Sequence, residues 1–112
     1  MARGLNSLER GDIYLYRFPR PNKQRPVVIL TRTEATQYLS QVTIAPISSA
    51  IRDVPSQIVL GESDGMKAPC AVNLHHITTV QRSQLGKHIT TLNHERMSDI
   101  CTALRFALGC DR

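Results

Sequence analysis

The 112-residue sequence contains no tryptophan, only three tyrosines and two phenylalanines, and no run of 18 apolar residues. Without such a run the sequence predicts no membrane-spanning helix. Residues 1–10 contain no apolar signal region, so we expect a cytoplasmic protein with no membrane partner. A glycine-rich phosphate loop and a strand–helix–strand repeat are also missing, which argues against a Rossmann or P-loop nucleotide-binding fold.

Cysteines and clustered metal ligands are equally scarce. The three cysteines, Cys70, Cys101 and Cys110, are odd in number and lack metal-ligand spacing. This pattern predicts free, buried thiols in a reducing cytosol. No grouping of histidine, cysteine and carboxylate residues has the spacing of a metal site, so we expect neither a metal nor another cofactor.

What the chain does have is an excess of positive charge. It carries 14 lysines and arginines against 9 acidic residues, for a formal net charge of +5. An anionic partner is therefore plausible on electrostatic grounds. The length predicts a single domain over residues 1–112 with one hydrophobic core, preceded by a polar, flexible segment at residues 1–9.

The positive charge is concentrated early in the chain. Between Ile13 and Thr33 there is no acidic residue, and the basic residues there are Arg17, Arg20, Lys23, Arg25 and Arg32. Clustered positive charge attracts phosphodiester backbones. The same stretch holds Tyr14, Tyr16 and Phe18, which we interpret as core residues of a strand rather than as platforms for unpaired bases.

Arg25 directly precedes Pro26 and the unbroken aliphatic run 27–30. Four consecutive aliphatic residues, three of them β-branched, predict a strand that is buried on both faces. Pro26 fixes its own φ and favours extended geometry for Arg25. A guanidinium is permanently charged and presents five donors in a planar fork, which suits a phosphate or carboxylate. The alternative is a surface arginine that extends beside the core.

Apolar runs and alternation predict six strands, at residues 13–18, 26–31, 41–47, 54–60, 70–80 and 87–92, the fifth of them long or bent. Residues 19–24 are expected to form a loop, and residues 33–39 a short helix with Thr33 as its N-cap. Pro46 predicts an irregular or edge position within its strand.

The last element is predicted to be a helix that begins after Asn93 and ends at Gly109. Its apolar stripe comprises Met97, Ile100, Cys101, Leu104 and Leu108, which we assign to the core. Short strands with one closing helix predict a small, strongly bent antiparallel sheet or barrel, mainly β with α.

Several segments of the chain occur in the same order as in a known family: residues 10–14, 25–30, 42–49 and 77–80, then the helix around residues 97–108. In these segments the chain resembles the MazF/PemK family of bacterial toxins. These toxins are the ribonucleases of toxin–antitoxin pairs. The resemblance implies an SH3-like, PemK-type barrel with a C-terminal helix, usually a homodimer. It also implies a metal-independent endoribonuclease that cuts single-stranded RNA at short sequences, and a cognate antitoxin that occupies the RNA groove.

The resemblance implies catalytic roles for Arg25 and for a hydroxyl at the end of the third strand, where the family has threonine and this chain has Ser48. Arg25 would stabilise charge on the phosphoryl oxygens, because a guanidinium is a poor base. Ser48 would donate to a phosphate oxygen; the alternative is a turn serine at the end of a strand. The residues expected to bind RNA are Arg17, Arg20, Lys23, Ser49 and His76. The first loop is shorter and more basic than the family's usual loop, so substrate preference is left open.

The general base is also left open. His75 and His76 are adjacent, so on a strand they would point to opposite faces. An imidazole makes a good proton shuttle near neutral pH, but we favour structural or RNA-contacting roles, with His76 in the groove. Two other functions fit the same fold: a gyrase-poisoning toxin similar to CcdB, and a barrel that binds RNA without cleaving it.

Overall fold

The computed structural model describes residues 7–110, so the predicted flexibility of residues 1–9 concerns a segment that lies largely outside them. The described chain contains seven antiparallel strands, which are β1 (Asp12–Phe18), β2 (Lys23–Ile29), β3 (Gln41–Ser48), β4 (Gln57–Leu60), β5 (Cys70–Asn73), β6 (Thr78–Gln81) and β7 (Leu85–Thr91). The α-helices are α1 (Thr33–Thr36) and α2 (His94–Leu108), and three short 3-10 turns are η1 (Glu62–Asp64), η2 (Leu74–His76) and η3 (Arg82–Gln84). No helix in this part of the chain is long and apolar enough to span a membrane.

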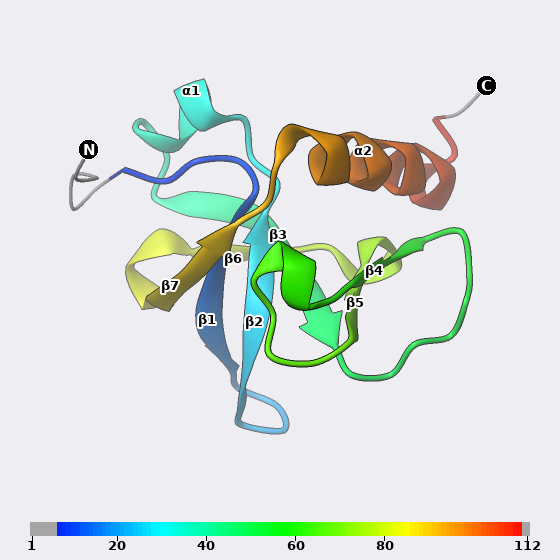
Figure 1. Ribbon diagram of the computed structural model, residues 1–112. Helices are drawn as coiled ribbons and strands as arrows, with labels where there is room; N and C mark the ends of the chain where they lie inside the picture. The colour runs from blue at the N-terminus through cyan, green and yellow to red at the C-terminus, as the bar shows by residue number, and fades with distance from the viewer. Residues whose placement is uncertain (1–6, 111–112) are drawn as a thin grey trace.

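The strands follow the order β4–β5–β3–β2–β1–β7, and β6 pairs with β3 beside this path (Figure 1). The strongly bent antiparallel sheet with a C-terminal helix agrees with the predicted mainly-β fold. Strand β3 is central, because its first residues pair with β6 and its last residues, Ile47 and Ser48, pair with β5. Pro46 lies between these two partners, where its missing N–H disrupts neither ladder. It therefore sits in a central strand, not at an edge.

The aliphatic run 27–30 is buried throughout, as predicted for a strand covered on both faces. Alternation sends its side chains to opposite sides of the sheet. Val28 and Leu30 join the core that α2 covers, whereas Val27 and Ile29 join a second cluster on the other face. The expectation of one core is thus wrong: two clusters form because α2 covers one face and the bent sheet encloses the other.

Helix α2 begins and ends as predicted. The Asn93 side chain accepts a hydrogen bond from the Arg96 N–H at 2.8 Å, and Gly109 adopts a left-handed φ of 73°. The buried stripe is centred on Ile100 and also includes Ala103. Leu108 lies outside this stripe and is 56% exposed, so its assignment to the core is wrong.

Three of the element boundaries that differ from the predictions do so because of a contact made elsewhere. Lys23 pairs with Phe18, so β2 begins three residues before Pro26 and the loop shrinks to residues 19–22. Residues 54–56 form a turn instead of strand, closed by the Gln57 N–H donating to the Val54 carbonyl at 3.0 Å. The predicted strand 70–80 is divided into β5 and β6 by the 3-10 turn η2.

Helix α1 is shorter than predicted and is not capped by Thr33. Thr33 lies within the helix, and its hydroxyl oxygen accepts a hydrogen bond from the Arg10 N–H at 2.9 Å. The Thr36 hydroxyl donates to the Leu8 carbonyl at 2.9 Å. Both threonines therefore attach α1 to the segment that precedes β1.

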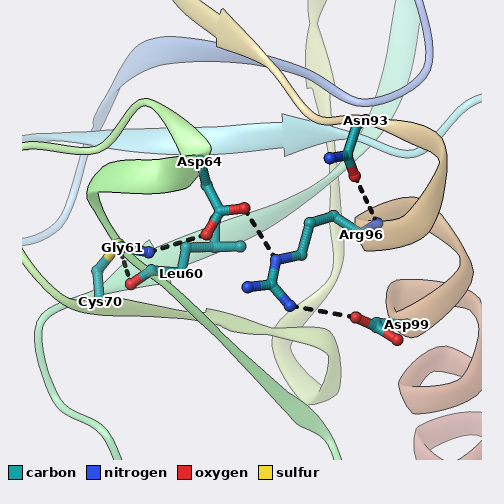
Figure 2. A network of polar contacts seen from close by, with 7 residues as sticks. All are labelled: Leu60, Gly61, Asp64, Cys70, Asn93, Arg96 and Asp99. Atoms are coloured by element: carbon teal, nitrogen blue, oxygen red, sulfur yellow. Dashed lines mark hydrogen bonds and ion pairs between the residues drawn. The ribbon is translucent and has the colours of Figure 1, made fainter.

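An ion pair fixes α2 to the turn η1 (Figure 2). Arg96 Nε donates to Asp64 Oδ1 at 2.8 Å, and Arg96 Nη1 donates to Asp99 Oδ2 at 3.3 Å. Burial opposes ionisation of the Asp64 carboxyl, but hydrogen bonds from Arg96 and from the Gly61 N–H, with the Arg96 charge, lower its pKa overall. The hydrogen bond to Asp64, together with its charge, raises the pKa of Arg96. The pair holds the helix against the loop that follows β4.

All three cysteines are free thiols, as predicted, but only Cys70 is buried. Burial, followed by the charge of Asp64, raises the pKa of the Cys70 thiol. Cys101 is half-buried, and Cys110 is exposed because it follows the helix-ending Gly109. The prediction of three buried thiols is therefore wrong for Cys110.

Candidate active site

A cavity of about 300 Å³ opens where the β1–β2 turn, the end of β3 and the turn η2 meet. In Figure 1 the β1–β2 turn and the end of β3 lie toward the same end of the molecule. The cavity is lined by Phe18, Arg20, Pro21, Arg25, Pro46, Ile47, Ser48, Ala50, Arg52, Asn73, His75 and His76. Three of these residues are arginines and none is acidic, so the cavity is suited to an anionic ligand.

Arg25 reaches the cavity from β2. It lies opposite Tyr16 of β1, so both side chains are on the same face of the sheet. That face carries the second core cluster, which includes Val27, and Arg25 extends it to the cavity. The side chain is half-buried, and no hydrogen bond or ion pair within residues 7–110 involves its guanidinium. Its donors are therefore available to a ligand.

Ser48 reaches the same cavity as the last residue of β3. Its Oγ accepts a hydrogen bond from the Ala50 N–H at 3.0 Å, which is the local contact of a turn serine. Because the oxygen is the acceptor in this contact, the hydroxyl proton can still be donated to a ligand. The turn and the ligand-binding interpretations of Ser48 are thus compatible with one another.

The segment after Ser48 is held in place by two buried amides. Gln57 Nε2 donates to Asn73 Oδ1 at 2.6 Å and to the Ala50 carbonyl at 3.1 Å. Gln57 Oε1 accepts a hydrogen bond from the Arg52 N–H at 2.8 Å. These contacts bring Arg52 and Asn73 to the cavity, although neither was predicted as a site residue. Arg52 lies four positions after Ser48 and could have been found by its charge, whereas no sequence signal pointed to Asn73.

Both histidines of η2 line the cavity, so the expectation that they point to opposite faces is wrong. They lie in a 3-10 turn, where successive side chains do not alternate as they do in a strand. Their ring centroids are 4.4 Å apart, in an edge-to-face arrangement. His75 Nδ1 also lies 2.6 Å from the hydroxyl oxygen of Ser56, which is itself buried.

The remaining predicted residues are distributed around the cavity. Arg20 lines it, whereas Arg17, Lys23 and Ser49 are exposed and do not. Arg17 Nη1 donates to the Asn22 carbonyl at 3.4 Å, across the β1–β2 turn. Of the aromatic residues in β1, Tyr16 is buried as expected, but the half-buried Phe18 contributes to the cavity wall. Among residues 7–110, no three histidine, cysteine or acidic side chains lie close enough together to hold a metal ion.

The fold is shared with solved toxin structures. The chain superposes on an endoribonuclease in complex with its cognate antitoxin from mycobacterial species, with a TM-score of 0.85, 24% identity, and coverage of 94% of this chain and 98% of that one. The Mycobacterium tuberculosis toxin MazF-mt6 gives a TM-score of 0.82 at 27% identity, covering 90% of this chain and 99% of that one. The first of these likenesses shows the fold alone.

Sequence comparison gives the family. The probable endoribonuclease MazF5 of Mycobacterium tuberculosis is 38% identical over 90 residues, which are 80% of this chain and 83% of that protein. Residues 9–108 match the model of the PemK-like, MazF-like toxins of type II toxin–antitoxin systems. The match spans nearly the whole described chain and includes all seven strands and helix α2. The chain therefore belongs to the PemK-like, MazF-like family of toxins of type II toxin–antitoxin systems.

Proposed function

We propose that this toxin is an endoribonuclease that cleaves single-stranded RNA in the cavity shared by Arg25 and Ser48. RNA supplies its own nucleophile, the 2′-hydroxyl next to the scissile phosphate. Attack of this oxygen on phosphorus expels the 5′-oxygen and leaves a 2′,3′-cyclic phosphate and a 5′-hydroxyl. The observation that carries the proposal is that the two residues, 23 positions apart in the sequence, line one cavity without acidic residues.

Arg25 acts on the charge that develops at the phosphoryl oxygens. Its planar donors are held on β2, whose residues 27–29 are buried. Little reorganisation is therefore needed when the transition state forms. Loss of one such donor costs about 2.7–4 kcal/mol of transition-state stabilisation. A guanidinium does not readily release a proton, so Arg25 is not the base.

Ser48 positions the phosphate. Its oxygen is anchored by the Ala50 N–H, which leaves the hydroxyl proton for a nonbridging phosphoryl oxygen. Where the family has threonine this chain has serine, so the hydroxyl is kept and only a methyl group is lost. The chemistry of the position is therefore preserved.

The RNA strand extends beyond the cavity over the basic turn. Arg20 and Arg52 line the cavity and contact the phosphates nearest the scissile bond, and His76 contacts the nucleotide bound there. Arg17, Lys23 and Ser49 are exposed outside the cavity and bind flanking nucleotides. Because several cations contact phosphates, affinity should fall steeply as salt concentration rises.

The partners follow from the same assignment. We propose that the toxin is a cytoplasmic homodimer and that a cognate antitoxin covers the RNA-binding surface. A neighbour in structure is described as an endoribonuclease in complex with its cognate antitoxin, which supports this arrangement for the present chain. A protein that neutralises such a basic cavity would place carboxylates near Arg25 and Arg52.

Incubation of the purified protein with end-labelled single-stranded RNA in EDTA tests the function. Fragments that end in a 2′,3′-cyclic phosphate are expected, because neither the nucleophile nor the charge stabilisation requires a metal. Intact RNA together with stalled DNA gyrase would instead identify a gyrase poison. Bound but uncut RNA would identify a nucleic-acid-binding barrel without catalysis.

A further inference from the structure

The contact between His75 and Ser56 joins two parts of the chain at the cavity. Ser56 lies in the turn before β4, and His75 lies in η2 after β5. Their Oγ and Nδ1 atoms are 2.6 Å apart, and Ser56 is only 8% exposed. The backbone supports the same pair, since the Leu74 N–H donates to the Ser56 carbonyl at 2.9 Å. The imidazole is therefore held in one orientation by a buried hydroxyl.

This contact has a chemical consequence for the ring. In a neutral imidazole one nitrogen carries the proton and the other accepts one, and the hydrogen bond made by one nitrogen sets the state of the other. If Nδ1–H donates to Ser56 Oγ, then Nε2 is left as an unprotonated acceptor. No hydrogen bond of the described residues involves this Nε2.

We propose that His75 is the general base of the RNA cleavage reaction and that Ser56 is its positioning residue. This assignment depends on the proposed endoribonuclease function and adds to it the proton acceptor that Arg25 and Ser48 do not provide. The sequence alone favoured His76 as the groove-lining histidine. His75 is the better base because it lines the same cavity and because its ring is fixed by a second, buried side chain.

Nε2 of His75 takes the proton of the 2′-hydroxyl as the bond from the 2′-oxygen to phosphorus forms. The bond between phosphorus and the 5′-oxygen breaks with its electron pair, and a water molecule supplies the proton for that oxygen. The imidazolium then returns its proton to the solvent, so no proton, electron or co-reactant is consumed.

The surroundings of His75 are compatible with this role. The charged or titratable residues that share its cavity are Arg20 and Arg25 from the β1–β2 hairpin, Arg52 from the loop after β3, and His76. No carboxylate is among them, so none competes with His75 for the proton. A guanidinium is a poor base, which leaves the two imidazoles as the proton acceptors that line the cavity.

The experiment measures single-turnover and steady-state cleavage of a labelled RNA from pH 5 to 9. His75→Gln should lower kcat by about 100-fold or more, which is typical for loss of a general base. It should also abolish the decline in rate on the acid side, with little change in RNA affinity. His94→Gln is the matched control, because His94 is exposed on α2 and does not line the cavity. It should keep the wild-type pH profile.

Two further variants keep the test decisive if His75→Gln folds poorly. His75→Gly should recover activity when imidazole is added, in proportion to its unprotonated concentration. Ser56→Ala should lower kcat rather than raise KM and should shift the acid side of the pH profile, which a purely structural role would not do. Wild-type kcat in a folded His75→Gln variant would overturn the assignment. The absence of imidazole rescue in His75→Gly, together with an unchanged pH profile in Ser56→Ala, would overturn it as well. A wild-type protein that leaves RNA intact would instead overturn the endoribonuclease function itself.

Discussion

Gln57 Nε2 donates a hydrogen bond to Asn73 Oδ1 at 2.6 Å, and both side chains are buried. The same glutamine contacts the backbone at Ala50 and Arg52. One side chain thus connects the end of β5 to the loop that carries Arg52. Rigid support of this kind decides how well an active site is organised before the substrate binds.

Gln57→Ala removes that connection. It should destabilise the fold by about 1–3 kcal/mol, because Asn73 and two backbone groups lose buried partners. It should also raise KM for RNA, since Arg52 is no longer held at the cavity. Urea unfolding and steady-state cleavage measure the two effects. Gln84→Ala is the control, because Gln84 is exposed in η3. Equal unfolding free energies and equal KM values for the two variants would show that the connection has no role.

Arg25→Ala tests charge stabilisation. Cleavage should fall roughly 100- to 1000-fold, as for loss of a donor to a developing oxyanion. Stability should change little, because no hydrogen bond or ion pair in residues 7–110 depends on the guanidinium. Initial rates and thermal unfolding measure these outcomes, with the exposed Arg105→Ala variant as control. Full activity of Arg25→Ala would exclude the catalytic role.

Two substitutions at Ser48 separate the hydroxyl from the rest of the side chain. Ser48→Thr keeps the donor and should preserve or raise kcat. Ser48→Ala should lower kcat by roughly 10- to 100-fold, the equivalent of a hydrogen bond to a charged group. Ser83→Ala, at an exposed position of η3, is the control for loss of a hydroxyl. Wild-type rates in both Ser48 variants would leave this residue only its turn contact with Ala50.

The Asp64–Arg96 pair predicts a pH dependence of stability. The folded pKa of Asp64 is lower than its ordinary value of 3.8, so the ionised form is favoured by folding. The resulting stabilisation is complete above about pH 5 and is lost as pH falls through 3.8 toward the folded pKa. Asp64→Asn should cost about 1 kcal/mol at pH 7, a modest amount because Arg96 is 33% exposed and solvent screens the pair.

Unfolding by urea at pH 7 and pH 3 measures this effect. The stability difference between wild type and Asp64→Asn should be smaller at pH 3 than at pH 7, because the wild-type carboxylate becomes protonated. Asp99→Asn provides the comparison, since its contact with Arg96 is longer, at 3.3 Å, and more exposed. A difference that does not change with pH would contradict the ion pair's contribution.

Gly65 is required by both conformation and space. Its φ of 91° is left-handed, and a Cβ there would lie 2.6 Å from the Thr90 hydroxyl oxygen. Gly65→Ala should therefore destabilise the fold by about 2 kcal/mol or more. Gly61→Ala is the matched control, because nothing lies within 4 Å of its added Cβ. Thermal unfolding distinguishes them, and equal melting temperatures would refute the clash.

Local patterns were sufficient for several elements. The run 27–30 identified the buried strand, although Arg25 lies within β2 and not at the edge that the prediction gave it. Asn93 and Gly109 marked both ends of α2, because capping is decided by neighbouring residues. The family and its fold followed from the order of several such segments. Of the predicted site residues, Arg20, Arg25, Ser48 and His76 line one cavity.

Errors arose where a contact between distant residues overrode a local preference. Residues 70–80 have the composition of one strand, but the structure divides them into two. Strand β5 pairs with β4 and with the end of β3, whereas β6 pairs with the beginning of β3. The 3-10 turn between the two strands directs both His75 and His76 to the cavity. Alternation along a strand, which was the basis of the prediction, does not apply inside such a turn.

The sequence by itself determined the buried strand, the helix ends and the identity of the cationic residue beside Pro26, because each depends on neighbours within a few positions. Only the tertiary structure decided which polar residues share the cavity. Ser56 meets His75 across 19 positions, and Gln57 meets Asn73 across 16. Such partners are selected by strand pairing and burial, which bring separate segments together without any local signal in either of them.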